Sequence, residues 1–290
     1  MNSTAEFWSG VQPGFRFTRC APGTPKFFRD VEQHRYALEP HIPEIARFDE
    51  WRGADVLEVG CGIGTDASRF ARAGARYTGV DQTDRALELA RQRFALDGLD
   101  GTFVRADATA LPFPDFSFDL VYSHGVIHHI PDTQAAVDEI HRVLRPGGVA
   151  LVMVYHRDSL NYRFNIVIVR RLLAATLAVP GADVFLRRVA PIDREFVAGH
   201  VELLRIHGLR YLTDGALFLS NNTDGPGNPL SKVYSRSDAC HFFGAFSDVD
   251  VETRYLNLRL YPKGDRLAAT RLARRLERRI GWHLYIRARR

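Results

Sequence analysis

Three glycines at alternate positions, Gly60, Gly62 and Gly64, stand between a short apolar run and a helix-forming stretch. The run over 56–59 is long enough for one buried strand, and residues 67–72 favour a helix. Glycines let the backbone turn tightly and approach a ligand, and the free N–H groups of a helix N-terminus bind anionic groups. A strand, a glycine turn and a helix in this order predict a ligand-binding edge.

The spacing of the glycines distinguishes two kinds of ligand. A dinucleotide fingerprint reads G-x-G-x-x-G, whereas here the third glycine comes one place early and Thr65 stands where Gly or Ala is expected. Glu58, two residues before Gly60, suits a ligand that carries an ammonium group. Asp81 follows the turn by about 20 residues, the spacing at which a carboxylate reaches ribose hydroxyls. We favour that role for Asp81 over capping of the helix expected at 83–96.

Further motifs follow in order. Asp107 and Ala108 come after a third expected strand, and the fourth strand, which ends near Ser123, is preceded by Leu-Pro-Phe-Pro-Asp-Phe-Ser-Phe-Asp and followed by His-His-Ile-Pro-Asp. Leu-Arg-Pro-Gly-Gly leads into the fifth strand. With Glu-Val-Gly-Cys-Gly-Ile-Gly at 58–64, this series resembles the class I S-adenosylmethionine-dependent methyltransferases of the small-molecule type. The resemblance covers residues 55–155.

The resemblance implies S-adenosylmethionine as the cofactor, bound along the edge where the strands end. In that family the acid after the third strand accepts a hydrogen bond from the adenine amino group, which assigns Asp107 and Ala108 to the adenine. The cofactor-binding residues expected on this basis are Glu58, Gly60, Cys61, Gly62, Gly64, Asp81, Gln82, Asp107, Ala108 and Ser123.

Methyl transfer from a sulfonium is an in-line displacement, so positioning supplies a large share of the acceleration. A base is needed only when the acceptor is a hydroxyl, a phenol or an acidic carbon. His128 and then His124 are the preferred candidates, His129 is a third, and all three are alternatively structural turn residues. We expect no metal site, because Gly125 and Pro131 disfavour the helix that would place His124 and His128 on one face.

The acceptor is less well specified. The aromatic residues expected around the lid suggest an apolar or aromatic small molecule, although most of them could be core residues; they are Tyr155, Tyr162, Phe164, Tyr211 and Phe218. Tyr36, Tyr155 and Asn222 are the candidate acceptor contacts, with Tyr234 as a further one.

Alternating strand and helix patterns predict an α/β fold: a Rossmann-like, seven-stranded, mostly parallel sheet with an antiparallel terminal strand and a helical lid. We expect four parts: an N-terminal arm and cap helices (1–52), the S-adenosylmethionine-binding core (53–155), a helical lid over the acceptor (156–234), and the end of the core with a basic C-terminal helix (235–290).

Several boundaries follow from local signals. Prolines and glycines predict an irregular arm over 1–29, and Asp30 and Gln33 predict a capping box for the next helix. The stretch 221–229 reads as a loop, and Ser237 is placed to cap a helix. The remaining expected elements are helices at 43–51, 160–178, 193–207 and 264–280, and strands at 248–260 and 282–288.

Composition sets broad limits. The 290 residues are 46% apolar, which is enough for a sizeable core. The three cysteines, Cys20, Cys61 and Cys240, lie far apart, so we expect neither a disulfide framework nor a zinc site, and a cytoplasmic location fits. No signal segment is evident at the N-terminus, and Arg170 and Arg171 interrupt the longest apolar run.

The net charge of +5 is concentrated at the C-terminus, where residues 263–290 carry ten Lys or Arg and two acids. A solvated basic helix face is the favoured explanation, with Leu272, Leu276 and Ile280 packed on the other side. Contact with nucleic acid or with an anionic membrane is the less favoured alternative. The oligomeric state is left open.

The leading function is therefore methyl transfer to O, N or C of a small-molecule acceptor. A second hypothesis keeps the donor but takes RNA, a quinone or a lipid as acceptor, because of the basic C-terminus. A third is a non-catalytic S-adenosylmethionine-binding protein, or an NAD-linked oxidoreductase, which the glycine spacing disfavours.

Overall fold

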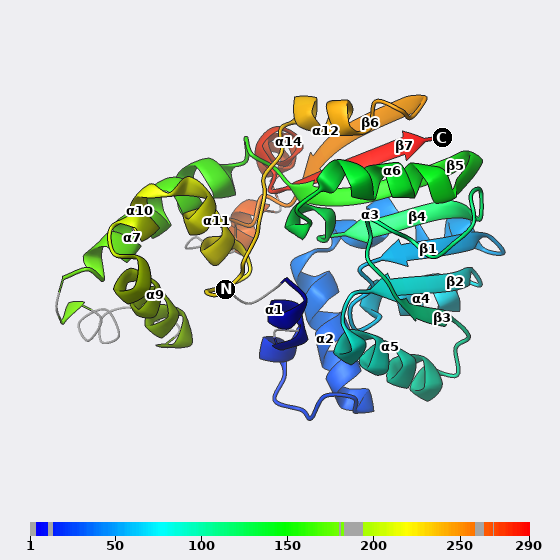
Figure 1. Cartoon of the computed structure of the whole chain (residues 1–290), viewed down its shortest axis with the longest axis horizontal. Helices are drawn as coiled ribbons and strands as arrows, with labels where there is room; N and C mark the ends of the chain where they lie inside the picture. Colours follow the sequence, from blue (N-terminus) through cyan, green and yellow to red (C-terminus); the bar gives the residue numbers. More distant parts are fainter. Residues whose placement is uncertain (1–3, 11–13, 180, 183–193, 259–263, 269) are drawn as a thin grey trace.

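The computed structural model contains a seven-stranded sheet with the strand order β3-β2-β1-β4-β5-β7-β6 (Figure 1). β1 to β5 run parallel, whereas β7 is antiparallel to both β5 and β6, as the sequence predicted. The strands are β1 (Asp55–Val59), β2 (Arg76–Asp81), β3 (Thr102–Arg105), β4 (Phe118–His124), β5 (Leu144–Tyr155), β6 (Asp248–Arg254) and β7 (His283–Arg289). The structure describes residues 4–10, 14–179, 181–182, 194–258, 264–268 and 270–290.

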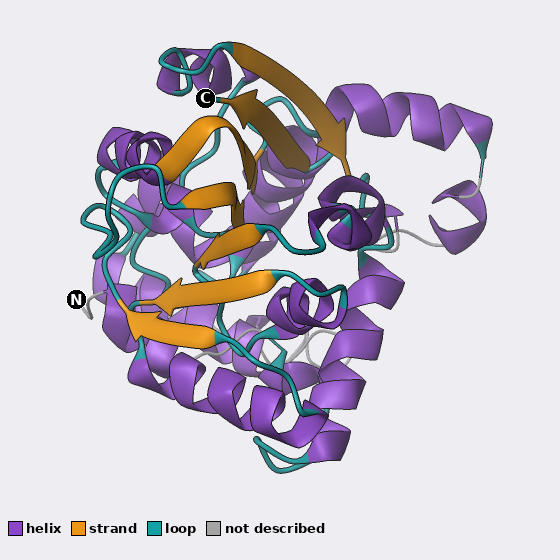
Figure 2. Cartoon of the chain, turned by 90° about the vertical axis from the view of Figure 1, so that its right-hand side faces the viewer, coloured by secondary structure: helices purple, strands orange, loops and turns teal. Residues whose placement is uncertain are grey.

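Both faces of the sheet are covered by helices (Figure 2). In β1, Leu57 packs with the helices of one face and Val56 with those of the other, because successive side chains of a strand point to opposite sides. Both residues are fully buried, because the strand is covered on its two faces. The first face carries α6 (Thr133–Val143) and α12 (Arg236–Phe242), and the second carries α3 (His41–Ala46), α4 (Thr65–Arg72) and α5 (Asp84–Asp97).

The parallel strands end along one edge. Val59 pairs with Val80, and Asp81 pairs with Arg105, so the turn after β1 and the ends of β2 and β3 are neighbours. β4 lies on the other side of β1 and leads into the 3-10 turn η3 (Ile127–His129). Ligands of open α/β sheets bind at such an edge.

The N-terminal segment contains more helix than the sequence predicted. The expectation of an irregular arm over 1–29 was wrong, since α1 (Thr4–Gly10), the 3-10 turn η1 (Phe15–Phe17) and the start of α2 (Pro25–Leu38) lie there. α2 begins five residues before Asp30, because the Thr24 side chain accepts a hydrogen bond from the Phe27 N–H (3.3 Å). Asp30 pairs with Lys26 instead (2.8 Å). The expected helix at 43–51 is divided into α3 and the 3-10 turn η2 (Phe48–Trp51).

A group of helices after β5 forms the part that we call the lid (residues 156–234). It lies to the left of the sheet in Figure 1 and has its own apolar cluster, which includes Ile166, Tyr211 and Phe218. The stretch 221–229 is not entirely a loop, because the last helix continues to Thr223. The lid elements are the π-helix η4 (Asn161–Arg170), α7 (Arg171–Thr176), α9 (Arg194–His207), α10 (Arg210–Thr213) and α11 (Gly215–Thr223). Part of the connection expected at Pro180-Gly181 lies outside the described residues.

The C-terminal part corrects three details. The cap of α12 is Ser235, not Ser237, and forms a reciprocal capping box with Asp238. β6 ends at Arg254, short of the expected limit of 260. The basic stretch forms α13 (Gly264–Ala268) and α14 (Arg271–Ile280), and Leu272 and Leu276 on α14 are exposed rather than packed as predicted. Among the helices of the described ranges, none combines the length and apolarity that a membrane crossing requires.

Candidate active site

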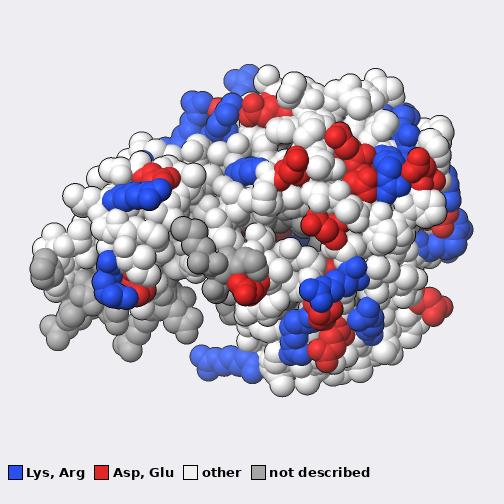
Figure 3. Space-filling view, in the orientation of Figure 1, with Lys and Arg blue, Asp and Glu red and all other residues white. Residues whose placement is uncertain are grey.

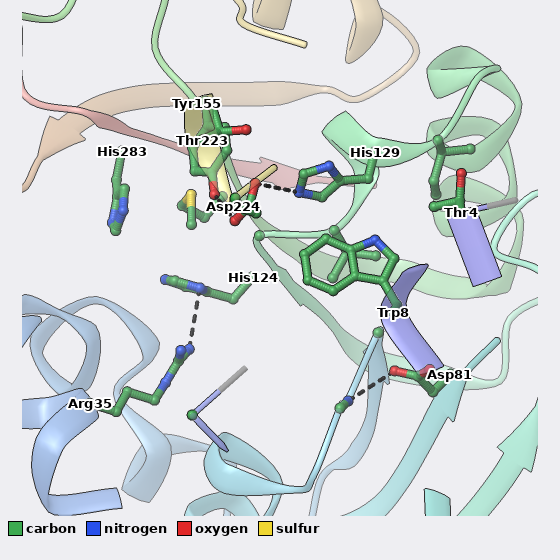
Figure 4. A pocket seen from close by; sticks show the side chains of 18 of the residues that line it. Thr4, Trp8, Arg35, Asp81, His124, His129, Tyr155, Thr223, Asp224 and His283 are labelled. Atoms are coloured by element: carbon green, nitrogen blue, oxygen red, sulfur yellow. Dashed lines mark hydrogen bonds and ion pairs between the residues drawn. The ribbon is translucent and has the colours of Figure 1, made fainter. Parts of the chain in front are cut away.

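A cavity of about 1370 Å³ opens along the edge where the parallel strands end and extends beneath the lid (Figure 4). Eleven of the predicted site residues line it: Glu58, Gly60, Cys61, Gly62, Asp81, Gln82, Asp107, Ala108, His124, Tyr155 and Asn222. Gly64, Ser123, His128 and Tyr36 are not among the lining residues.

The glycine turn forms the floor of the cavity. Gly60, Gly62 and Gly64 all have positive φ angles (77°, 52° and 77°), which disfavour side chains. A Cβ on Gly62 would meet no atom within 4 Å, so backbone is exposed to the cavity there. Gly64 has a different task, because a Cβ there would lie 3.3 Å from the Cβ of Ala90 on α5. The third glycine therefore permits close packing of α4 on α5.

Asp81 joins the ends of β1 and β2. Its Oδ2 accepts a hydrogen bond from the Gly62 N–H (3.0 Å), and its Oδ1 accepts from the N–H and hydroxyl of Thr83 (2.9 Å each). Burial raises the pKa of Asp81, although these hydrogen bonds act in the opposite direction. A carboxylate has about four lone-pair sites, so Asp81 retains capacity for hydroxyl donors from a ligand. Its prediction as a ribose ligand is compatible with this geometry.

Glu58 is buried at the end of β1, with 4% of its surface exposed. The Tyr77 hydroxyl donates to Oε2 (2.6 Å). Burial, together with the nearby carboxylate of Asp66, raises the pKa of Glu58 well above its usual value. A ligand ammonium group at this point would supply the charge that favours the ionised form.

Asp107 lies at the outer rim of the cavity. Its Oδ1 accepts from the N–H and hydroxyl of Thr109 (2.8 Å each), whereas Oδ2 has no hydrogen-bond partner among the described residues. Oδ2 can thus accept from an exocyclic amino group, and the Ala108 backbone is its immediate neighbour. The residues present at the rim fit an adenine ring in the predicted place.

A buried network around Asp66 was not predicted. The Arg35 guanidinium binds both carboxylate oxygens of Asp66 (3.1 and 2.7 Å). The hydroxyls of Tyr36 and Tyr122 also donate to this carboxylate (2.8 and 2.9 Å). Burial opposes the charge, yet Arg35 and the hydrogen bonds hold the pKa of Asp66 below its usual value. Tyr36, a candidate acceptor contact, is thereby turned toward α4.

The network continues to His124 (Figure 4). Arg35 Nη2 lies 3.3 Å from His124 Nδ1, which must accept, and His124 Nε2 lies 2.9 Å from the Tyr285 hydroxyl, to which it donates. Burial and the charge of Arg35 lower the pKa of His124 well below its usual value. His124 is therefore a neutral imidazole whose two ring nitrogens are both engaged.

His128 and His129 have different surroundings although they are adjacent. His128 is fully buried against the Tyr155 ring (4.0 Å between centroids), and neither ring nitrogen has a hydrogen-bond partner in the described part of the chain. His129 lines the cavity. Its Nδ1 donates to the Leu230 carbonyl (2.6 Å), and its Nε2 lies 3.5 Å from Asp224 Oδ2. The structure thus brings His129 to the cavity in place of the preferred candidate, His128.

The lid supplies the far wall. Tyr155 donates to Asp224 Oδ1 (2.8 Å) and stacks on Trp282 (4.3 Å between centroids). Asn222 is buried, and its Oδ1 has no hydrogen-bond partner among the described residues. Tyr234 does not line the cavity, because its hydroxyl bonds to Thr133 (2.7 Å). The apolar lining of this wall consists of Leu173, Ala174, Leu177 and Val197.

Other candidate sites are few. Within the described ranges, no group of three or more His, Cys, Asp or Glu side chains is arranged to hold a metal ion. Cys20, Cys61 and Cys240 are free thiols. Ser123 is buried with its hydroxyl unpartnered among the described residues, and it lies behind the lining rather than in it.

Comparison with known proteins points to one family. Residues 57–152 match the family model described as a methyltransferase domain. An uncharacterised methyltransferase of Mycobacteroides abscessus is 37% identical over 139 residues, which are 48% of this chain and 53% of that protein. The fatty-acid O-methyltransferase of Mycolicibacterium smegmatis is 41% identical over 122 residues, which are 41% of this chain and 43% of that protein. The sterol 24-C-methyltransferase of Neurospora crassa is 35% identical over 137 residues, which are 46% of this chain and 34% of that protein. The chain thus spans about half or less of the length of these relatives.

Solved structures agree on the fold. A methyltransferase of Haloferax volcanii, in complex with the Trm112 methyltransferase activator, superposes with a TM-score of 0.55 at 17% identity, covering 92% of this chain and 95% of that one. An S-adenosylmethionine-dependent methyltransferase of Mesorhizobium loti superposes with a TM-score of 0.50 at 22% identity, covering 86% of this chain and 97% of that one. The domain over residues 57–152 therefore belongs to the class I S-adenosylmethionine-dependent methyltransferases, a family whose cofactor is S-adenosylmethionine.

Proposed function

We propose that this chain transfers a methyl group to a small-molecule acceptor held beneath the lid. The observation that carries the proposal is the continuity of the cavity. The same space is lined by Gly62 and Asp81 at the sheet edge and by Tyr155 and Asn222 toward the lid. A donor and an acceptor bound in one continuous cavity can be aligned for an in-line displacement, which accounts for much of the rate of such reactions.

The donor end is formed by the core over 53–155. Glu58 would bind the ammonium group, the backbone at Gly60 and Gly62 would follow the ligand closely, Asp81 would hold the ribose and Asp107 the adenine. S-adenosylmethionine, when bound, supplies an electrophilic methyl group on a positively charged sulfur. The protein contributes position and the exclusion of water.

His129 is the proposed base for a hydroxyl or phenol acceptor. Because its Nδ1–H donates to the Leu230 carbonyl, the neutral ring carries its lone pair on Nε2. That nitrogen is buried with no hydrogen-bond partner among the described residues and lies 3.5 Å from Asp224 Oδ2. An acceptor hydroxyl would have to reach it at the cavity wall, where the carboxylate would stabilise the imidazolium that forms. His124 has no free lone pair for this task and instead positions the Arg35 side chain.

The acceptor we propose has an apolar body. Leu173, Leu177 and Val197 give the lid wall an apolar surface, and Arg170 and Asn222 add polar groups to it. Two relatives with named acceptors, the fatty-acid O-methyltransferase and the sterol 24-C-methyltransferase, support this class. A hydroxyl or carboxyl oxygen on an apolar skeleton is the acceptor type that fits both the apolar and the polar groups of the lid wall.

The test uses S-adenosylmethionine labelled on its methyl group. The full chain is incubated separately with a long-chain fatty acid, a sterol and a phenol, and labelled product is counted after extraction. We expect transfer to at least one apolar acceptor, and loss of that transfer in Leu173→Glu with donor binding unchanged. Donor binding without transfer to any of the three would contradict the proposed acceptor class.

A further inference from the structure

Helix α14 presents an unusual outer face. Leu272 is 66% exposed and Leu276 is 38% exposed, one helical turn apart, while Ala273 of the same helix is buried against the sheet side. Five arginines of α14 are also exposed, which gives a ridge of guanidinium groups beside the two leucines. They are Arg271, Arg274, Arg275, Arg278 and Arg279.

Acids of the described residues do not pair with the arginines of this face. None of the five guanidinium groups forms an ion pair with a carboxylate within the described ranges. The acid of α14, Glu277, is turned toward the protein, where its Oε1 accepts a hydrogen bond from the Tyr255 N–H (2.7 Å). α13 adds an exposed arginine and an exposed leucine, Arg266 and Leu267. Basic side chains are visible near the position of α14 in the upper left of Figure 3.

The helix is fixed in place before any partner arrives. Thr270 caps its N-terminus, since the side chain accepts from the Ala273 N–H (3.1 Å). At the other end the Glu277 carbonyl accepts from the Thr253 hydroxyl (2.8 Å), and the Arg278 carbonyl accepts from the Arg236 guanidinium (3.0 Å). Binding through α14 therefore carries little cost of ordering the helix.

We propose that the exposed arginine and leucine face of α14, extended by α13, docks on an anionic lipid surface. Arginines bind the headgroups, and Leu272 and Leu276 enter the boundary between headgroups and acyl chains. Arginines alone would serve RNA equally well, but exposed leucines would not, and α14 carries no aromatic side chain to stack on bases. The inference is independent of the proposed function, although it gives an apolar acceptor a source.

The inner side of α14, opposite the docking face, lies next to the cavity. Tyr255, bonded to Glu277, and Trp282, two residues after the end of α14, both line it. A lipid surface held against the outer side of α14 would thus be separated from this wall of the cavity by a single helix.

The experiment is cosedimentation of the full chain with phosphatidylcholine vesicles, with and without phosphatidylglycerol. We expect binding only to the anionic vesicles, weakened by added salt. The triple variant Arg271→Gln, Arg275→Gln, Arg279→Gln should lower the partition coefficient by about 100-fold. Leu272→Ser with Leu276→Ser should lower it by about tenfold or more.

Matched controls lie on exposed positions elsewhere. Arg19→Gln, Arg29→Gln and Arg52→Gln remove the same charge, and Leu96→Ser removes a leucine that is 51% exposed. These controls should leave vesicle binding within about twofold. Equal binding to neutral vesicles, no effect of the leucine variant, or salt-sensitive binding to transfer RNA without binding to anionic vesicles would each overturn the proposal.

Discussion

His129 Nε2 lies 3.5 Å from Asp224 Oδ2, which connects the turn after β4 to the loop that follows α11 in the lid. The pair spans the two halves of the cavity, and Tyr155 holds the second carboxylate oxygen (2.8 Å). The proposed base, His129, would therefore be complete only when core and lid are both in place.

Replacement of His129 separates catalysis from binding. His129→Gln should lower kcat with a hydroxyl acceptor by about 10²–10⁴-fold, since the proton then has no acceptor at the site. The affinity for S-adenosylhomocysteine, measured by calorimetry, should stay the same. His128→Gln, the matched variant at the neighbouring residue, should not lower kcat in this way. Equal rates for wild type and His129→Gln would exclude this base.

Asp66 is expected to be a stability residue. Asp66→Asn removes the charge that pairs with Arg35 and leaves that guanidinium only the longer ion pair with Glu39 (3.8 Å). The amide keeps one acceptor oxygen, so one of the two tyrosine hydroxyls loses its acceptor. The free energy of unfolding should fall by about 3–5 kcal/mol. Urea denaturation followed by circular dichroism measures this, with Asp84→Asn on the exposed start of α5 as the control. A loss below that of the control would mean that the network contributes little.

The buried histidines make stability depend on pH. Burial lowers the pKa of His41 to about 3, and burial also lowers the pKa of His283 well below its usual value. Below about pH 6.5 the unfolded chain therefore binds more protons than the folded chain does. Each such histidine lowers the free energy of unfolding by about 1.4 kcal/mol per pH unit as the pH falls. Urea midpoints at pH 7.5, 6.5 and 5.5 should decrease in that order. His41→Gln should make the decrease shallower, and an unchanged slope would argue against a neutral buried His41.

Glu39 makes stability fall as the pH rises, the opposite of the effect of the buried histidines. Burial raises the pKa of Glu39 from 4.5 to about 7, against the attraction of Arg35. Its contribution to stability is complete below about pH 4.5 and is lost as the pH rises through 7. Glu39→Gln should therefore be relatively more stable than wild type at pH 8 than at pH 5. Glu44→Gln, at an exposed position, should differ in stability from wild type by the same amount at both pH values. The same pH dependence for Glu39→Gln and Glu44→Gln would refute the raised pKa of Glu39.

Much of the core could be predicted because its signals are local. The glycine turn, Asp81 and Asp107 each follow a strand, and parallel strands bring their ends to one edge without further information. The lid was predicted as helical, but its limits depended on tertiary contacts, as when α11 continues through Asn222, whose amide bonds to the Tyr211 hydroxyl (3.0 Å).

The histidine pair shows where sequence patterns end. Nothing in His-His predicts which ring faces the cavity, because that depends on the direction of η3 and on Leu230, about 100 residues later. The prediction that the leucines of α14 pack against the protein was wrong for a related reason. Ala273 and Glu277 face the sheet, which leaves the four-residue repeat of leucines on the outside. Helical periodicity identifies a stripe, but it does not say which stripe the fold covers.

The central claim is that the ends of β1, β2 and β3 jointly hold S-adenosylmethionine. Calorimetric titration of S-adenosylhomocysteine into wild type and Asp81→Ala tests it most directly, with Asp84→Ala as the control on the adjacent helix. Loss of charge-assisted hydrogen bonds to two ribose hydroxyls should weaken binding by about 100-fold or more, while Asp84→Ala binds as wild type does. Equal affinities for wild type and Asp81→Ala would contradict the assignment of the donor to this edge.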